Sequence, residues 1–430
     1  MAPALSHAAA LAPRLVPPLV LPPVLPSGRG RHAGHDPSFA PAPVETFIDL
    51  AGPRRWAERV RELQRLAAGG PRAGRAERQR HGIEWTIERL RRGLGTPSPL
   101  ETRIARLATA AAELAEGLSP AGQDRLRAAL DAALTGTGTL VGLFHLLRTA
   151  SSYRDRGFAV IFSGLEEAAP FDLLLRRDAA EAEVVCDVVS AEQGRGLPRA
   201  AWLHLADRID ADLQTWLAAH PGRYLLKMTL PDGLPLAADG ETLAALHASI
   251  RRLLAAQSRS EQDAAVVLRL DPLLLAGAQA DETDTLARLR REFGPEAQLA
   301  VTGGDGGLFV LAARAGREDA VAVAIRRRMA AIAPTRLTGT RPGILAMFIE
   351  DTERAEWRGL RDRLELEGEA RQFLTCPEAR PVVAVTCVSR FELLGMAPPD
   401  AVADGELRFR NPAHPAARSA ALAPAVLSTV

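Results

Sequence analysis

The most informative pattern of apolar and polar positions lies between residues 170 and 199. An apolar run over 171–176 is followed by a turn at Asp178 and by a second apolar run over 182–189 that is rich in β-branched residues. This composition is typical of strands that are buried on both faces. Because side chains alternate along a strand, Glu183 and Asp187 share one face of the second strand. Unpaired carboxylates are costly to bury, so each of them requires a cation, a metal ion, water or a strand end.

The rest of the chain from residue 136 onward alternates between helical and strand patterns. Before the strand pair, the sequence predicts a helix over 139–153 and a strand over 158–162. After it, we expect helices over 198–220, 241–256, 284–293, 317–332 and 352–373, and strands over 224–230, 264–270, 299–301, 308–312, 344–349, 382–388 and 409–412. This alternation predicts an α/β protein with mixed sheets flanked by helices.

The two ends of the chain have a different composition. Residues 1–45 are rich in proline and alanine and are expected to be disordered. Prolines at 17, 18, 22 and 23 interrupt the apolar stretch over 15–25. A secretory signal is disfavoured there, and the chain has no run of about 18 apolar residues that could span a membrane. Residues 413–430 are expected to form a flexible tail.

Arginine is dense over residues 53–92, where the pattern predicts amphipathic helices. Such a surface could contact nucleic-acid phosphates. The favoured interpretation is a solvated helical face on which Glu58, Glu62 and Glu88 pair with neighbouring arginines. Two further amphipathic helices are expected over 100–134, with a helix start at Ser119-Pro120.

Composition narrows the class of protein. The chain has 430 residues, of which 47% are hydrophobic and 24% charged, as in an ordinary globular protein of one or two domains. A formal net charge of +1 argues against a surface that binds polyanions as a whole. Lys227 is the single lysine, a bias that indicates a GC-rich bacterial genome. The three cysteines have no metal-ligand spacing, which predicts reduced thiols and a cytoplasmic protein.

The segment Pro170-Phe171-Asp172, followed by the strand over 183–187, resembles the PD-(D/E)XK nuclease superfamily. In that family a Pro-Asp-like step opens one strand, and an acid-x-Lys triplet lies on the next. The resemblance implies a restriction-endonuclease-like mixed sheet, with Val185 at the second acid position and Asp187 at the lysine position. It also implies a first helix that gives a glutamate to the metal, whereas the helix over 139–153 contains no glutamate and offers polar side chains such as His145, Arg148, Thr149 and Ser152.

This resemblance suggests five regions along the chain. They are a disordered N-terminus (1–45), an arginine-rich helical region (46–135), a nuclease-like core (136–232), a C-terminal α/β region (233–412) and a flexible tail (413–430). Whether the C-terminal region is a separate domain or part of one sheet stays open.

Under the resemblance, the chain is a metal-dependent nuclease that acts on DNA or RNA. Asp172 and Asp187 would bind Mg²⁺, and Glu183 faces the same way. Lys227, on the next strand, could supply the positive charge that the triplet lacks. Arg195, Arg199 and Gln193 are the other candidates, as nucleic-acid contacts or to orient water. Glu350 and Asp351 end an expected strand, but the sequence identifies no metal-binding partner for them.

The alternative is a nuclease-fold protein that has lost its metal site and serves as a nucleic-acid- or protein-binding module. Two of the three motif positions are altered, which favours this alternative. The two hypotheses differ in geometry. An active site requires the carboxylates of Asp172 and Asp187 about 4 to 5 Å apart, given metal–oxygen bonds near 2.1 Å. An inactive site instead has either acid locked in an arginine pair.

Overall fold

In the part of the chain that the structure describes, seven helices precede the first strand. The computed structural model describes residues 42–236, 240–273, 297–304, 307–389 and 406–429, together with Leu289 and Phe293. The helices are α1 (Ala42–Ala51), α2 (Pro53–Ala67), α3 (Ala73–Arg80), α4 (Gly82–Arg91), α5 (Pro99–Gly117), α6 (Pro120–Ala133) and α7 (Val141–Asp155). Helix α5 begins with a capping box between Ser98 and Glu101, and Ser119 caps α6 as the sequence predicts. The N-terminal region is therefore helical.

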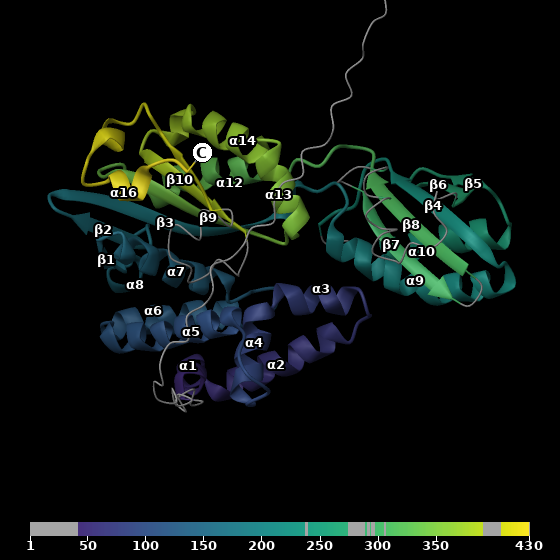
Figure 1. Cartoon of the computed structure of the whole chain (residues 1–430), viewed down its shortest axis with the longest axis horizontal. Helices are drawn as coiled ribbons and strands as arrows, with labels where there is room; N and C mark the ends of the chain where they lie inside the picture. Colours follow the sequence, from purple (N-terminus) through teal and green to yellow (C-terminus); the bar gives the residue numbers. More distant parts are fainter. Residues whose placement is uncertain are drawn as a thin grey trace, which may run out of the picture. The chain divides into compact units, whose positions relative to one another are not determined.

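The first sheet contains six strands in the order β1-β2-β3-β9-β10-β11 (Figure 1). They are β1 (Ala159–Ile161), β2 (Leu173–Arg177), β3 (Ala180–Ser190), β9 (Gly343–Glu350), β10 (Val382–Val388) and β11 (Leu407–Arg410). The pairs β1–β2 and β2–β3 are antiparallel, β3–β9 and β9–β10 are parallel, and β11 is antiparallel to β10. The sheet is therefore mixed, with the parallel strands at its centre.

Helices cover both faces of this sheet (Figure 1). On one face, α7 and the N-terminal helices pack against Val184 and Ile344 in a single apolar cluster. On the other, Val185 and Leu345 pack against α12 (Val321–Arg336), α13 (Arg354–Asp362) and α14 (Glu365–Leu374). Burial on both faces explains the nearly continuous apolar runs of β3, β9 and β10.

A second sheet, β5-β6-β4-β8-β7, is formed by the chain between β3 and β9. Its strands are β4 (Gly222–Leu230), β5 (Ser260–Gln262), β6 (Val267–Pro272), β7 (Gln298–Gly304) and β8 (Gly307–Ala315). Helices α9 (Arg199–Ala219) and α10 (Gly240–Ala255) pack on it through an apolar cluster of its own. Short helices complete the described chain: α8 (Ser163–Glu166), η1 (Ala191–Gly194), η2 (Pro377–Ala379), η4 (Pro415–Arg418) and α16 (Ala423–Val426).

The fold confirms the α/β class, the mixed sheets flanked by helices and the helical N-terminal region. It corrects the boundary that we expected at residue 232. Strand β4 belongs to the second sheet, whereas β9, β10 and β11 from the expected C-terminal region complete the first. The reason is that an apolar strand pattern identifies a strand but does not identify its neighbour in the sheet. Among the described residues, no helix is long and apolar enough to cross a membrane.

The ends of the chain also differ from expectation. Residues 42–45 lie in α1 rather than in a disordered segment, while residues 1–41 and most of the expected helix over 284–293 lie outside the described residues. The expected flexible tail over 413–430 is instead packed: Leu422 and Val426 are buried in the apolar cluster around α7. The amide of Thr429 also donates a hydrogen bond to the carbonyl of Arg408 in β11. Apolar burial and this backbone pairing hold the C-terminal segment in place.

Candidate functional site

The two acids that the sequence singled out lie on neighbouring strands. Leu173 pairs with Val184 in the antiparallel β2–β3 ladder, so Asp172, directly before β2, stands beside the middle of β3. The Asp172 carboxylate accepts a hydrogen bond of 2.7 Å from the amide of Cys186. Burial raises the pKa of Asp172, and the negative charge of Asp187 adds to the rise while Arg336 opposes it. Asp172 therefore lies beside the strand that carries Asp187, as the sequence predicts.

Both carboxylates are engaged by arginines of α12. The Nε and Nη2 atoms of Arg328 donate to the two oxygens of Asp187 at 2.6 and 2.7 Å, a bidentate pair. The Nη2 atom of Arg336 donates to Asp172 at 2.9 Å. The Asp187 side chain is only 9% exposed and that of Asp172 is 24% exposed. The acids therefore have the arginine partners that the inactive alternative requires.

Glu183 does not join them. Its side chain is fully buried and accepts hydrogen bonds from the amide and the hydroxyl of Thr338, the amide at 2.9 Å. Arg341 lies 3.6 Å from the same carboxylate. Glu183 thus holds the segment that leads from α12 into β9, and its expected place in a metal site is not supported by these contacts.

Lys227 is separated from the acids by the fold itself. It lies on β4 in the second sheet, where its ammonium group pairs with Asp271 at 3.1 Å and lies over the ring of Phe293. The expectation that β4 lies in the same sheet as β3 was wrong. Because β4 belongs to the second sheet, Lys227 does not lie beside Asp187. In the ranges that the structure describes, no group of three or more His, Cys, Asp and Glu side chains is arranged to hold a metal ion.

The candidate nucleic-acid contacts are mostly occupied as well. Arg195 is buried and forms ion pairs with Glu192 and Glu356, the latter at 2.6 Å. Arg199 donates to Glu356 at 3.3 Å, so both arginines serve internal contacts rather than a phosphate surface. Gln193 is exposed in η1.

The arginine-rich helices show the favoured pairing. Arg54 pairs with Glu58 and Arg59 with Glu62, and Glu88 binds two neighbouring arginines. Arg59 is 1% exposed and donates to the carbonyls of residues 136 and 138 before α7. Arginines of this region therefore connect structural elements, and the interpretation as paired helical faces is confirmed for these residues.

Helix α7 places no carboxylate against the strand pair. The Nε2 atom of His145 donates a hydrogen bond of 2.9 Å to the carbonyl of Ala346, and burial lowers the pKa of His145 to about 4, so the imidazole is neutral at pH 7. Arg148 pairs with Glu406, a residue next to β11. The polar side chains of α7 thus serve the interior of the first sheet.

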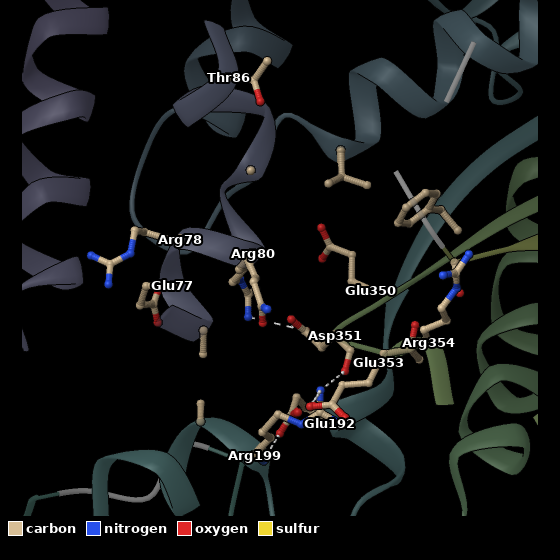
Figure 2. Close-up of a pocket in the computed structure, with 18 of the residues that line it drawn as sticks. Glu77, Arg78, Arg80, Thr86, Glu192, Arg199, Glu350, Asp351, Glu353 and Arg354 are labelled. Carbon is tan, nitrogen blue, oxygen red and sulfur yellow. Dashed lines mark hydrogen bonds and ion pairs between the residues drawn. The ribbon is translucent and has the colours of Figure 1, made fainter. Parts of the chain in front are cut away.

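A second group of carboxylates lies at the carboxyl ends of β3, β9 and β10. These ends open into a pocket of about 700 Å³ between the sheet and helices α3, α4 and α5 (Figure 2). Polar residues at the strand ends include Glu350 of β9, Asp351 directly after it, and Ser389 after β10. The carboxyl edge of parallel strands is the usual ligand position in open α/β sheets.

Glu350 and Asp351 have different surroundings in this pocket. Asp351 accepts a hydrogen bond of 2.5 Å from the hydroxyl of Ser190 and lies 3.5 Å from Arg80. Glu350 accepts one of 2.6 Å from the hydroxyl of Thr139. Burial, with the negative charges of Asp351 and Glu84, raises the pKa of Glu350, and Arg80 counters the rise only in part.

Asp351 has a backbone conformation that non-glycine residues seldom adopt. Its φ is 60°, in the left-handed region. Its carbonyl accepts a hydrogen bond of 2.9 Å from Arg195, and Arg199 lies at 3.4 Å. These arginines hold the strained turn that carries the chain from β9 into α13. Strained residues of this kind are concentrated at functional sites.

Comparison with protein-family models, with curated proteins and with solved structures finds no match to this chain. The pocket was only partly visible in the sequence. The pattern placed Glu350 and Asp351 at a strand end, but their neighbours Arg80 and Thr139 come from the helical region far earlier in the chain. The position of the two acids at the end of a buried strand was the signal that could have indicated the site.

Proposed function

We propose that this chain is a non-catalytic protein built around a restriction-endonuclease-like sheet, and that it acts as a binding module. The observation that carries the proposal is the pairing of Asp187 with Arg328 and of Asp172 with Arg336. In a metal-dependent nuclease these carboxylate oxygens bind the divalent cation. Here guanidinium groups occupy the same oxygens.

The arrangement of strands supports the nuclease-like part of the proposal. Helix α7 is followed by the antiparallel strands β1, β2 and β3, and then, after the second sheet, by α12 and the parallel strand β9. This is the order of elements that the resemblance implies, with the second sheet as an insertion between the third and fourth strands of the core.

The energetics support the non-catalytic part. A bidentate arginine–carboxylate pair forms two charge-assisted hydrogen bonds, and the Asp187 side chain is 9% exposed. A Mg²⁺ ion would have to displace Arg328 and shed its own water ligands, which it does reluctantly. The released guanidinium would then lie beside the cation that displaced it. Both effects oppose metal binding at this site.

The internal use of arginine favours a protein partner over a nucleic acid. Phosphate binding needs arginines that are free to contact a polyanion. Arg59, Arg72 and Arg195 are instead committed to carboxylates or carbonyls within the chain. The formal net charge of +1 agrees with this assignment.

The test is cleavage of supercoiled plasmid and of single-stranded DNA and RNA with Mg²⁺ or Mn²⁺. We expect no metal-dependent cleavage by the intact chain. Cleavage that depends on metal and is abolished by Asp172→Ala would overturn the proposal. Asp178→Asn is the matched control, because Asp178 lies in the β2–β3 turn at a φ of 53°, a conformation that asparagine tolerates.

A divergent metal-dependent nuclease is the second candidate. It is supported by the position of Asp172 beside β3, the strand that carries Asp187. In that case Arg328→Ala and Arg336→Ala together should free the acids and increase metal-dependent cleavage. A double variant that stays inactive, folds and fails to bind Mn²⁺ would exclude this candidate.

A further inference from the structure

The pocket at the carboxyl ends of β3, β9 and β10 combines an apolar wall with a carboxylate. Leu100 of α5 is partly exposed and contributes apolar surface, whereas Ile104, Val141 and Phe348 line the pocket with only 1% of each residue exposed. Glu350 extends from the end of β9 into the space between the sheet and α4, where Thr86 lies opposite (Figure 2). A site of this kind suits a ligand with an aliphatic part and a polar head.

Glu350 is the acid of this pocket without a cationic partner. Asp351 has Arg80 and Ser190, and Glu192 has the buried ion pair with Arg195. For Glu350, no lysine, arginine or histidine among the described residues lies within ion-pair distance, and the hydroxyl of Thr139 is its hydrogen-bond donor. A mostly buried carboxylate with one neutral donor retains unused acceptor capacity.

Negative charges near Glu350 further disfavour an ionised carboxylate that has no cationic partner. Asp351 and Glu84 both disfavour its ionised form, and Arg80 compensates in part. Glu84 is 1% exposed, and its Oε2 atom has no hydrogen-bond partner in the described part of the chain. Glu350 therefore has two acidic neighbours and one arginine near it.

Ser389 is a second, independent indication of a ligand. It follows β10, lines the pocket and is 7% exposed. Its hydroxyl has no hydrogen-bond partner within the described ranges. Buried hydroxyl groups are nearly always paired, and an exception at a pocket wall indicates a missing partner.

We propose that this pocket binds a guanidinium or ammonium group carried on an aliphatic chain. Glu350 is the counter-ion, and the hydroxyl of Ser389 is an acceptor for a further N–H of the head group. Leu100, which is partly exposed at the pocket wall, packs against the aliphatic chain. The inference concerns a different site from the Asp172–Asp187 pair and holds whether or not the chain cleaves nucleic acid.

Arginines also line this pocket, so the alternative hypothesis is that it binds an anionic ligand. Arg80 and Arg199 are directed at Asp351 and Glu356, and Arg78 and Arg354 are exposed. The cationic-ligand and anionic-ligand hypotheses predict opposite effects of one substitution. Removing the charge of Arg80 strengthens the binding of a cation and weakens the binding of an anion.

The experiment is a calorimetric titration of the full chain with butylguanidinium, butylurea and butyl phosphate. Butylurea has the size and shape of butylguanidinium without the charge. We expect butylguanidinium to bind at least about tenfold more tightly than butylurea, and Glu350→Gln to remove that difference. Arg80→Gln should tighten butylguanidinium binding by about twofold to threefold.

Three results would overturn the proposal. One is the absence of saturable binding up to about 50 mM butylguanidinium, well above the range expected for a small ligand with a specific counter-ion. Another is tighter binding of butyl phosphate that Arg80→Gln weakens. The third is butylguanidinium binding that Glu350→Gln leaves unchanged.

Two further arms identify the site and the source of the cation. Thr86→Trp fills the pocket opposite Glu350 without removing a charge, and it should abolish binding while circular dichroism confirms folding. A Gly-Gly-Arg-Gly-Gly peptide presents the same head group as a protein side chain. Tighter binding of the peptide than of butylguanidinium assigns the cation to a partner protein, and weaker binding assigns it to a free small molecule.

Discussion

Two groups of carboxylates on the first sheet have opposite surroundings. Asp172 and Asp187, beside the middle of β3, face α12 and each has an arginine of that helix. Glu350, at the end of β9, has a threonine hydroxyl and two acidic neighbours. The helix or loop opposite a carboxylate thus decides its role. Arginines hold Asp172 and Asp187 within the structure, whereas Glu350 has a neutral donor and, in our proposal, receives its counter-ion from a ligand.

The sharpest way to break this comparison is Arg328→Ala. It leaves the nearly buried Asp187 carboxylate without its bidentate partner, and breaking a buried pair costs about 3 to 5 kcal/mol. Because the Arg328 side chain is 42% exposed and water can reach the site, we expect a loss of about 2 to 3 kcal/mol in the free energy of unfolding. Urea denaturation measures it.

The control for that experiment is Arg327→Ala, which removes an exposed arginine one position earlier on α12. Its effect should stay within about 0.5 kcal/mol. The double variant Asp187→Leu/Arg328→Met should recover most of the lost stability, because apolar residues of similar volume can replace a buried pair. Equal effects of Arg327→Ala and Arg328→Ala would show that the pair is not structural.

Arg336→Ala should have a smaller effect than Arg328→Ala. Asp172 is more exposed than Asp187, forms one hydrogen bond with Arg336, and keeps the amide of Cys186 when the arginine is removed. We expect a loss of about 1 to 2 kcal/mol by urea denaturation. A loss larger than that of Arg328→Ala would reverse the ranking of the two acids.

The raised pKa of Glu350 should make the free energy of unfolding depend on pH. The pKa of Glu350 is raised in the folded state, mainly by burial, so the folded chain holds that proton to higher pH than the unfolded chain. Its contribution to stability therefore falls as the pH rises from the ordinary glutamate pKa of 4.5 through the raised pKa of the folded state. Relative to Glu350→Gln, the native chain should lose stability over this window. An increase with rising pH in the urea midpoint of the native chain minus that of Glu350→Gln would contradict this sign.

Arg80→Gln should be the mildest change. The distance from Arg80 to Asp351 is 3.5 Å, and the Arg80 side chain is 31% exposed. Asp351 keeps the hydroxyl of Ser190, so we expect less than about 0.5 kcal/mol in the free energy of unfolding. A loss of about 2 kcal/mol or more would place Arg80 with the arginines of α12 as a structural partner.

The sequence predicted local features better than distant ones. It identified β2 and β3 as strands, and their pairing follows from the tight turn at Asp178. It also placed Asp172 on the segment beside the strand that carries Asp187. It could not show that Arg328 and Arg336 cover these acids, because the arginines lie 141 and 164 residues away from them. Arginines are common on helix surfaces, and their positions in the sequence do not predict which carboxylate each one contacts.

The sequence could not predict which sheet each strand joins, because local patterns do not identify partners that lie far apart in the chain. Strands β4 and β9 have similar apolar patterns, but β9 rather than β4 lies beside β3. Glu350 was likewise recognised as the end of a strand, while the pocket around it is completed by helices from the first quarter of the chain. Only the assembled fold brings these parts together.

The insertion of the second sheet has a consequence for biosynthesis. Strand β3 leaves the ribosome well before β9, because residues 191–342 lie between the two. During that interval the apolar surfaces of β3 and its edge toward β9 stay unpaired. Contacts between residues so far apart in the sequence form slowly. We therefore expect the nascent chain to need a chaperone or an early-folding second sheet, and chains truncated before residue 343 to aggregate.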